Sequence, residues 1–218
     1  MRAVIFDLDE TLLNRDATVR AFLADQYSRH HEEGEERDSF ISRFMELDQG
    51  GYVPKREVYA QLQREFDWVN DTVFLQEYEE NLSQFCVPFE GTAQLLSGLF
   101  GRYKLGMITN GQEKMQRSNI QELGLDAYFD TILISETEGV KKPSPEIFER
   151  VCERLDVSPE QCVYIGDHPE NDVAAAQAVG MKGYWKVNDR FSCHFADEYI
   201  TSFDHLRFVL DAESRMTG

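Results

Sequence analysis

Acidic residues follow apolar runs at two points of the chain, in spacings that can do chemistry. Asp7 and Asp9 come directly after the apolar residues Ala3–Phe6, and Asp167 and Asp172 follow a later apolar run. If each run is a strand that ends in a loop, its two carboxylates converge on one site. One can then attack an electrophile while the other transfers protons, or both can bind a divalent metal ion through oxygen. Each pair by itself is also compatible with solvated loop acids.

Groups that can hold a phosphoryl unit lie between these acids. Thr109, Asn110 and Gly111 follow another apolar run, and a hydroxyl with exposed main-chain N–H groups in a glycine turn can bind phosphoryl oxygens. Lys142 stands directly before a proline and a predicted helix start, which favours it over its neighbour Lys141 as a fixed positive charge. Each feature alone is equally typical of an ordinary turn or a surface lysine, so their joint order along the chain carries the argument.

The second acidic segment also contains a histidine. Asp167 suits direct metal ligation, and Asp172 suits a supporting or lysine-pairing role behind it. Because magnesium prefers oxygen ligands, His168 is interpreted as facing the substrate or as exposed, not as a ligand.

The elements that must position these residues alternate between apolar runs and helical patterns. Short continuous apolar runs are typical of strands buried on both faces of a parallel sheet. Their alternation with helices predicts an α/β, doubly wound, Rossmann-like sheet whose ligands bind at the carboxyl ends of the strands. The runs are Ala3–Phe6, Leu105–Ile108, Thr131–Ile134, Cys162–Ile165 and a weaker one at Gly183–Lys186.

One long stretch, residues 15–86, interrupts this alternation. It shows four apolar stripes at helical spacing, broken by Gly50-Gly51 and by the polar tract Glu32–Glu36. We therefore predict a core domain of residues 1–14 and 87–218 with a helical domain of residues 15–86 inserted after the first strand. Its position makes the insert a candidate lid.

Length and charge exclude several classes of protein. The 218 residues include 40 acidic and 22 basic side chains, a formal net charge of −18. That balance argues against nucleic-acid polymers and anionic membrane surfaces as partners. The chain has no apolar run of transmembrane length, and its four cysteines form no CxxC pair, so we expect a cytoplasmic protein. For its oligomeric state, a monomer and a homodimer both stay open.

The order of acid pair, threonine, lysine and second acid pair resembles the haloacid dehalogenase-like hydrolase superfamily, over nearly the whole chain. The residues that match its four motifs are, in order, Asp7–Thr11, Thr109, Lys142 and Gly166–Asp172. The resemblance implies a Rossmann-like core, and the helical insert looks like the family's cap of the helical type.

The resemblance also implies a mechanism. Asp7 would attack phosphorus to form an aspartyl-phosphate, while Asp9 would protonate the leaving oxygen and then activate water. Thr109 and Lys142 would hold the phosphoryl oxygens. Mg²⁺ would be bound by the carboxylates of Asp7 and Asp167 and by the Asp9 main-chain carbonyl. Residues expected to assist are Asn110 and Gly111 at the phosphate, and Thr11 and Asp172 behind the site.

These features predict a magnesium-dependent phosphatase for a small phosphorylated metabolite, such as a nucleoside monophosphate or a sugar phosphate. The strings Thr109–Gly111, Ser135-Glu136 and Gly139–Pro143 are similar to those of the 5′-nucleotidase and N-acylneuraminate-9-phosphatase branch. Side chains of the insert that could contact a leaving group are the cations Arg15, Arg20, Arg43, Lys55 and Arg56 and the rings Phe22, Tyr52 and Tyr59.

Other readings of the same pattern stay open. A 2-haloacid dehalogenase is disfavoured because halide displacement needs no acid at Asp9. A phosphonate hydrolase would need a cap lysine, and Lys55 is the insert's only one. A phosphomutase shares the core motifs. A receiver-like phosphoaspartate signalling module would place its aspartate after a later strand, and a binding protein without catalysis would lack at least one motif residue.

Overall fold

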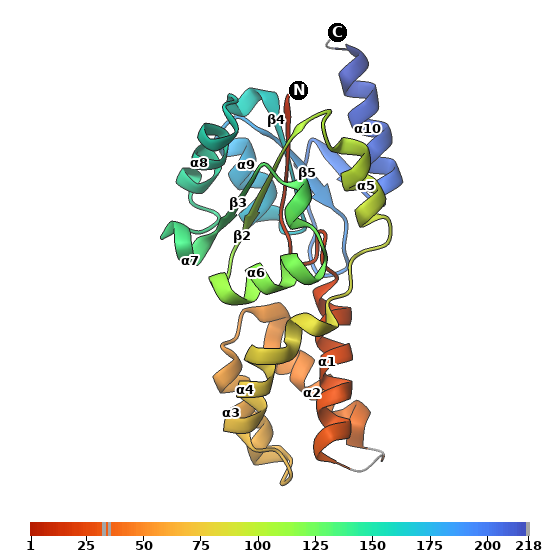
Figure 1. Ribbon diagram of the computed structural model, residues 1–218, viewed down its shortest axis with the longest axis vertical. Coiled ribbons are helices and arrows are strands. Elements are labelled where there is room, and N and C mark those ends of the chain that lie inside the picture. The colour runs from red at the N-terminus through yellow and green to blue at the C-terminus, as the bar shows by residue number, and fades with distance from the viewer. Residues whose placement is uncertain (32–33, 35, 217–218) are drawn as a thin grey trace. The chain divides into compact units, whose positions relative to one another are not determined.

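The structure, a computed structural model, describes residues 1–31, 34 and 36–216. The chain divides into two compact units, residues 1–14 with 88–218 and residues 15–87 (Figure 1). Of the polar tract predicted to interrupt the insert, Glu32, Glu33 and Glu35 lie outside the described residues. None of the helices in the described ranges has the length and apolar character needed to cross a membrane.

The first unit is built on a sheet in which, over the described residues, six strands pair in parallel in the order β3-β2-β1-β4-β5-β6. The predicted α/β Rossmann-like class is therefore confirmed. β1 lies at the centre between β2 and β4, and each of its residues is completely buried, as its unbroken apolar sequence requires. The strands are β1 Ala3–Phe6, β2 Lys104–Thr109, β3 Thr131–Ile134, β4 Cys162–Gly166, β5 Lys182–Lys186 and β6 Glu198–Ile200.

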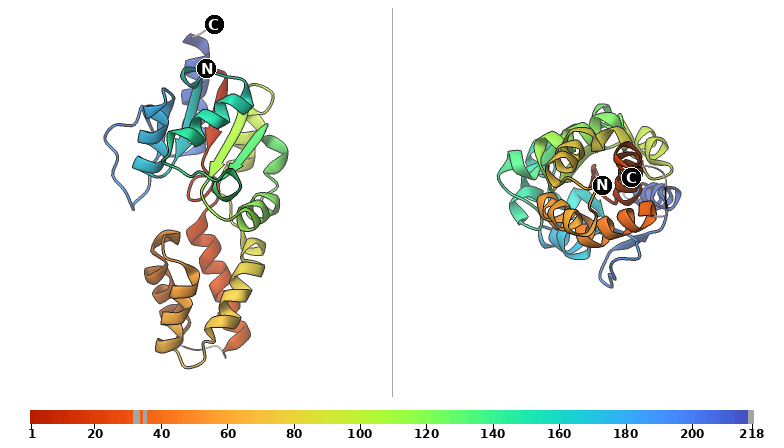
Figure 2. Two further views of the ribbon diagram at one scale, coloured as in Figure 1. Left: turned by 90° about the vertical axis from the view of Figure 1, so that its left-hand side faces the viewer. Right: turned by 90° about the horizontal axis from the view of Figure 1, so that it is seen from below.

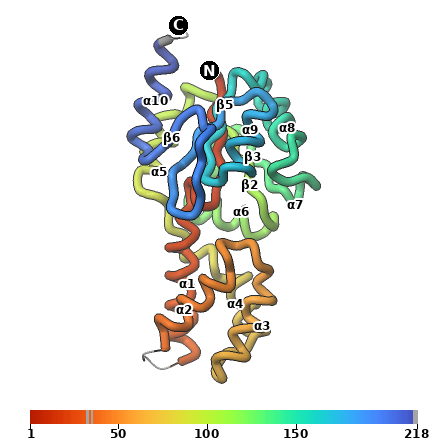
Figure 3. Tube along the Cα trace, turned by 180° about the vertical axis from the view of Figure 1, so that it is seen from behind, coloured from red at the N-terminus to blue at the C-terminus, as the bar shows by residue number. Residues whose placement is uncertain are grey.

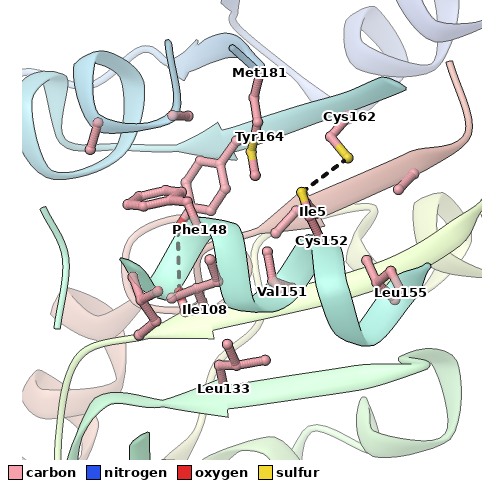
Figure 4. Close-up of a cluster of buried hydrophobic side chains, with 14 residues drawn as sticks. Ile5, Ile108, Leu133, Phe148, Val151, Cys152, Leu155, Cys162, Tyr164 and Met181 are labelled. Carbon is pink, nitrogen blue, oxygen red and sulfur yellow. Dashed lines mark hydrogen bonds between the residues drawn. The ribbon is translucent and has the colours of Figure 1, made fainter. Parts of the chain in front are cut away.

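Helices cover both faces of this sheet. Because side chains alternate along a strand, Ile5 and Tyr164 belong to one face, where they pack with Phe148 and Val151 of α8 and with residues of α9 (Figure 4). The helices α5 and α10 contact each other away from α8 and α9 (Figure 3). The helices of this unit are α5 Thr92–Leu99, α6 Glu113–Glu122, α7 Ser135–Glu138, α8 Pro145–Leu155, α9 Ala175–Ala178 and α10 Phe203–Met216, with a π-helix at Pro169–Ala174.

The second unit is helical, and its helices lie alongside one another (Figure 2). They are α1 Arg15–His30, α2 Glu36–Asp48, α3 Lys55–Glu65 and α4 Asp71–Asn81. Their apolar stripes meet in an aromatic core in which Phe22, Phe44, Tyr59 and Tyr78 are almost completely buried. Phe22 and Tyr59 are therefore unable to stack on a ligand, whereas Tyr52 is exposed.

A buried carboxylate ties together three segments of the second unit. Asp48 has no exposed surface and forms ion pairs with Arg15, at 2.8 Å, and with Lys55. Burial alone would raise the pKa of Asp48, but the charges of Arg15 and Lys55 outweigh it and hold the pKa below its usual value. Two further cations predicted to face a ligand are paired at the surface, Arg20 with Asp16 and Arg43 with Glu46 and Glu65.

Candidate active site

The register of the sheet brings three chemically active segments to one edge. Phe6 at the end of β1 aligns with Met107 of β2 and with Ile165 of β4. Asp7, the next residue, donates its N–H to the Ile165 carbonyl at 2.9 Å, which continues the ladder by one step. The residues that follow β1, β2 and β4 therefore project from the same carboxyl edge, the position where open α/β sheets bind ligands.

Lys142 is the positive centre of this edge. Its ammonium lies 2.6 Å from Asp7 Oδ1, 2.7 Å from Asp172 Oδ1 and 3.1 Å from the Tyr164 hydroxyl, and its side chain is almost completely buried. Burial alone would lower the pKa of Lys142, but the carboxylates of Asp172 and Asp7 hold it well above its usual range. Lys142 is therefore a permanent charge beside Asp7, with no capacity to act as a base at neutral pH.

Three buried carboxylates face one another around this lysine. One carboxylate oxygen from each of Asp7, Asp167 and Asp172 lies within 4.8 Å of the other two. Burial is the main cause that raises the pKa of Asp7 to about 7, against the lowering effect of Lys142. Burial, together with the charges of Asp7 and Asp172, raises the pKa of Asp167 to about 8.

The three acids differ in how far their oxygens are already engaged. Asp172 accepts from Lys142 and Tyr164 at Oδ1 and from the His168 N–H at Oδ2. Asp7 accepts from Lys142 and, at 3.3 Å, from the Thr11 hydroxyl. The Asp167 carboxylate accepts no hydrogen bond from any residue in the described part of the chain. Asp167 and Asp7 are thus the carboxylates with coordination capacity, and Asp172 supports Lys142.

This donor set fits a magnesium ion. Its ligands are hard carboxylate oxygens, the type that Mg²⁺ prefers over nitrogen or sulfur. When all three acids are ionised, they carry three negative charges against the single positive charge of Lys142, an excess that one divalent cation would neutralise. The Asp9 carboxylate is bonded to Gln116 and is not one of these three acids, so the role of its main-chain carbonyl as a ligand stays a prediction.

The main chain of Asp167 is held from behind by two residues that sequence reasoning missed. Trp185 donates its indole N–H to the Asp167 carbonyl at 2.7 Å, and Asn188 donates its amide to the same oxygen at 2.9 Å. Both come from β5 or the residues directly after it. Nothing in the spacing of Trp185 and Asn188 marked them, because only the pairing of β4 with β5 brings them to this carbonyl.

Gly166 is the residue that lets Asp172 reach the site. A Cβ atom at Gly166 would lie 2.3 Å from Asp172 Cγ, closer than any real contact. The glycine is therefore required for space, so that the π-helix after β4 can fold back over the strand end and place Asp172 against Lys142.

Asp9 and Thr109 meet through a glutamine that sequence reasoning also missed. Gln116 of α6 donates from Nε2 to Asp9 Oδ2 at 2.7 Å and to Thr109 Oγ1 at 2.5 Å. By spacing alone, the apolar residues Met115, Ile120 and Leu123 would form the buried face of this helix. In the structure the buried residues of α6 are Gln116, Asn119 and Ile120.

The Asn110 side chain and the Gly111 N–H are engaged with protein groups. The Asn110 amide donates to the Lys142 carbonyl at 3.0 Å and accepts from the Lys142 N–H at 2.9 Å, which fixes the lysine's main chain. The Gly111 N–H donates to the Ser135 hydroxyl at 3.0 Å. The contribution of Asn110 thus reaches the site through Lys142.

His168 begins the π-helix that follows β4. Its Nδ1 accepts hydrogen bonds from the N–H groups of Glu170 and Asn171, both at 3.1 Å, and its ring packs against Phe191. Burial is the main cause that lowers the pKa of His168. The interpretation of His168 as substrate-facing or simply exposed missed this role: the neutral ring caps the helix that carries Asp172.

A second cation, the half-buried Lys186, supports the loop after β1. Its ammonium donates to the Glu10 carbonyl at 2.8 Å and lies 3.2 Å from the centre of the Phe89 ring. Burial lowers the pKa of Lys186 to about 8 against the opposing charges of Glu10, Asp167 and Asp7. Its position at the end of β5 gave no sequence signal, because that run was predicted only as a strand.

Comparison with known proteins supports the same assignment of the fold. The family of haloacid dehalogenase-like hydrolases matches residues 4–186. The glyceraldehyde 3-phosphate phosphatase of Pyrococcus furiosus is 29% identical, over 98% of this chain and 95% of that protein. The corresponding enzyme of Pyrococcus abyssi is 31% identical, over 85% of this chain and 81% of that protein.

A solved structure matches most of the chain. YfnB of Bacillus subtilis, a HAD hydrolase solved bound to magnesium, is 25% identical and superposes with a TM-score of 0.77, covering 96% of this chain and 98% of that one. The family match covers well over half of the sequence and includes every motif residue from Asp7 to Asp172. The chain belongs to the haloacid dehalogenase-like hydrolases.

Proposed function

We propose that this protein is a magnesium-dependent phosphatase that hydrolyses a small phosphomonoester through an aspartyl-phosphate on Asp7. The observation that carries the proposal is the placement of Asp7. It is a buried carboxylate paired with the permanent charge of Lys142 and lies beside Asp167. Asp9 follows it by two residues and is joined to Thr109 through Gln116. A nucleophile, an acid and positive charge for the equatorial oxygens are what in-line phosphoryl transfer needs.

The two half-reactions assign a role to each residue. In the first, an Asp7 oxygen forms a bond to phosphorus while the bond to the ester oxygen breaks, and Asp9 gives that oxygen its proton. In the second, Asp9 takes a proton from water as the water oxygen bonds to phosphorus and the bond to Asp7 breaks, which releases phosphate. Lys142 and the Thr109 hydroxyl bind phosphoryl oxygens throughout.

The chain's own residues also account for the metal requirement that we propose. Asp7 and Asp167 would hold Mg²⁺ through their carboxylates, with the Asp9 main-chain carbonyl as a third protein ligand. When bound, the ion supplies positive charge to the phosphoryl oxygens. Trp185 and Asn188 keep the Asp167 main chain in place for this role.

The names of the relatives support a small phosphorylated metabolite as the substrate. They include two glyceraldehyde 3-phosphate phosphatases, the pyrimidine 5′-nucleotidase YjjG of Escherichia coli and N-acylneuraminate-9-phosphatases of mammals. The matches to YjjG and to the rat N-acylneuraminate-9-phosphatase cover less than half of this chain. We propose that residues 1–14 and 88–218 form the catalytic core, and that residues 15–87 act as the cap that selects among such substrates. We propose a location in the cytoplasm.

A panel of phosphomonoesters, assayed with Mg²⁺ and with a chelator, tests the proposal. The panel includes triose phosphates, nucleoside monophosphates and sugar phosphates. Asp7→Asn is expected to lower kcat by at least about four orders of magnitude, because loss of a covalent nucleophile leaves only binding contributions. Asp126→Asn, an exposed residue of the same unit, serves as the matched control. Hydrolysis that survives Asp7→Asn, or that persists in the chelator, would contradict the proposal.

A further inference from the structure

Gln116 touches two groups to which the proposed mechanism gives different tasks. Its side-chain nitrogen lies 2.7 Å from Asp9 Oδ2 and 2.5 Å from Thr109 Oγ1, and the residue is only 4% exposed. Asp9 is the proton donor for the leaving oxygen, and Thr109 binds the phosphoryl group. One amide group therefore joins the acid to the phosphate-binding loop.

The orientation of this amide is set by its other end. Asn119, one turn further along α6, donates from Nδ2 to Gln116 Oε1 at 3.2 Å. A reversed amide would place its oxygen against the Asp9 carboxylate, acceptor against acceptor, and its NH₂ group against the Asn119 donor. Both neighbours thus favour the arrangement in which Gln116 presents N–H groups to Asp9 and Thr109.

The turn after β2 is built to let Gln116 approach. Gly111 has a φ of +149°, and a Cβ atom there would lie 3.0 Å from Gln116 Cγ. A side chain at this position would press on the glutamine, so the glycine keeps room for the buried amide beside the strand end.

The number of hydrogens then fixes what the Thr109 hydroxyl does. The Gln116 amide nitrogen carries two hydrogens. Its two short contacts are to Asp9 and Thr109, whereas the Asn110 carbonyl lies further away, at 3.5 Å, so one hydrogen goes to Asp9 and the other to Thr109. Thr109 Oγ1 is thereby an acceptor for Gln116, which directs its own hydrogen to a different partner. Phosphoryl oxygens only accept hydrogen bonds, so a hydroxyl committed to donate is matched to them.

We propose that Gln116 is a positioning residue of this hydrolase, holding the Asp9 carboxylate in place for proton transfer and orienting the Thr109 hydroxyl as a donor to the phosphoryl group. The inference rests on the proposed function, because it takes the tasks of Asp9 and Thr109 from there. Gln116 itself forms no bond to the reacting atoms and acts through these two residues.

The dependence of rate on the leaving group separates this role from simple support of the fold. Gln116→Met keeps the side-chain length and removes both N–H groups. An alkyl phosphate such as glycerol phosphate needs a proton on its leaving oxygen, whereas p-nitrophenyl phosphate releases a stable anion without one. Since general acids contribute about 10²- to 10⁴-fold, the ratio of kcat/KM for these two esters is expected to shift at least about tenfold against the alkyl ester.

A second measurement, inhibition by inorganic phosphate, tests the orientation of the Thr109 hydroxyl. Inorganic phosphate, used as a competitive inhibitor, is expected to bind about three- to tenfold more weakly to Gln116→Met, the range that one hydrogen bond supplies. Gln116→Glu, which keeps the shape but sets a carboxylate against Asp9, is expected to shift both quantities further in the same directions. Gln121→Met, an exposed glutamine on the same helix, is the matched control and is expected to leave both unchanged.

The proposal is overturned if both Gln116 variants lose activity equally toward the two esters with unchanged inhibition by phosphate, since a general loss of structure gives that pattern. It is also overturned if both variants behave like wild type. Asp7→Asn, assayed alongside, distinguishes a failure of the proposed function from a failure of the positioning role of Gln116. Activity retained in Asp7→Asn refutes the proposed function, whereas an inactive Asp7→Asn with a wild-type Gln116→Met refutes the positioning role alone.

Discussion

The Lys142 ammonium lies 2.7 Å from Asp172 Oδ1, and both side chains are almost completely buried. Thirty residues of sequence separate the two, and their pairing holds the loop before α8 against the π-helix after β4. The same ammonium contacts Asp7, so the position of the Asp7 carboxylate depends on the pairing of Lys142 with Asp172.

Substitution of Lys142 and substitution of Asp172 are each expected to lower the free energy of unfolding, and the two effects are expected not to add. Lys142→Met leaves the buried carboxylates of Asp7 and Asp172 without their cation, and Asp172→Asn leaves Lys142 paired with the Asp7 carboxylate alone. A double-mutant cycle in chelator, measured by urea unfolding, is expected to give a coupling free energy of about 1.5–3 kcal/mol. The exposed pair Arg102–Asp211 is the control, with an expected coupling below about 1 kcal/mol. Equal couplings in the two cycles would show that burial adds nothing to the first pair.

Gly166→Ala is expected to lower both stability and activity. The added methyl group overlaps the Asp172 side chain and pushes it from Lys142, at an expected cost of about 1–3 kcal/mol in the free energy of unfolding. Gly98→Ala, in the exposed face of α5 with no atom within 4 Å of the new Cβ, is expected to stabilise by about 0.5–1 kcal/mol. The same calorimetric or urea experiment measures both variants, and opposite signs are the expected result.

Trp185 is expected to report metal binding by its fluorescence. Its indole N–H donates to the main-chain carbonyl of Asp167, so occupation of the Asp167 carboxylate changes the surroundings of the ring. Titration with Mg²⁺ at constant ionic strength, without substrate, is expected to give a saturable change in emission. Trp185→Phe and Asp167→Asn should each abolish it, while Trp68→Phe in the second unit should retain it. A response that persists in Trp185→Phe would place the signal elsewhere.

Asp48 is expected to make the stability of the protein depend on pH in acid. Because its pKa is lowered by folding, its contribution is present above the unfolded value of 3.8 and is lost as the pH falls through the lower folded value. Asp48→Asn is expected to destabilise by about 3 kcal/mol or more at pH 7, because Arg15 and Lys55 lose their buried partner.

The gap in urea midpoint between wild type and Asp48→Asn should therefore stay constant from neutral pH to about pH 4.5 and narrow below it. Asp25→Asn removes an exposed pair on α1 and should shift the midpoint little at any pH. A difference in urea midpoint that widens in acid would contradict a lowered pKa of Asp48 in the folded protein.

Much of the fold could be predicted because its strongest elements have local signals. The apolar run Ala3–Phe6 is typical of a strand covered on both faces, and the stripes between residues 15 and 86 have the spacing of helices. β6 was missed, because only one residue of Glu198–Ile200 is fully buried and an edge strand of that length has no period to detect.

The site could be predicted only as far as its residues carried a sequence pattern. Asp7, Lys142 and Asp172 stand at spacings that imply a shared edge of the sheet, and the structure brings them together. Gln116 and Trp185 act through partners that are distant in sequence, and a buried glutamine or tryptophan has the same local pattern as an ordinary core residue. His168 shows the opposite case, a residue type that suggests chemistry but whose ring nitrogen is used by the main chain.

The central place of β1 has a consequence for how the protein is made. β1 comes before both of its neighbours, β2 and β4, along the chain, so during synthesis it has neither partner until residue 109 has emerged and lacks the second until residue 166. During that interval the entirely apolar segment Ala3–Phe6 and the Asp7 carboxylate that follows it lack the strands that later bury them. A chain truncated before β4 lacks Asp167 and Asp172, so it cannot form the cluster of buried carboxylates around Lys142.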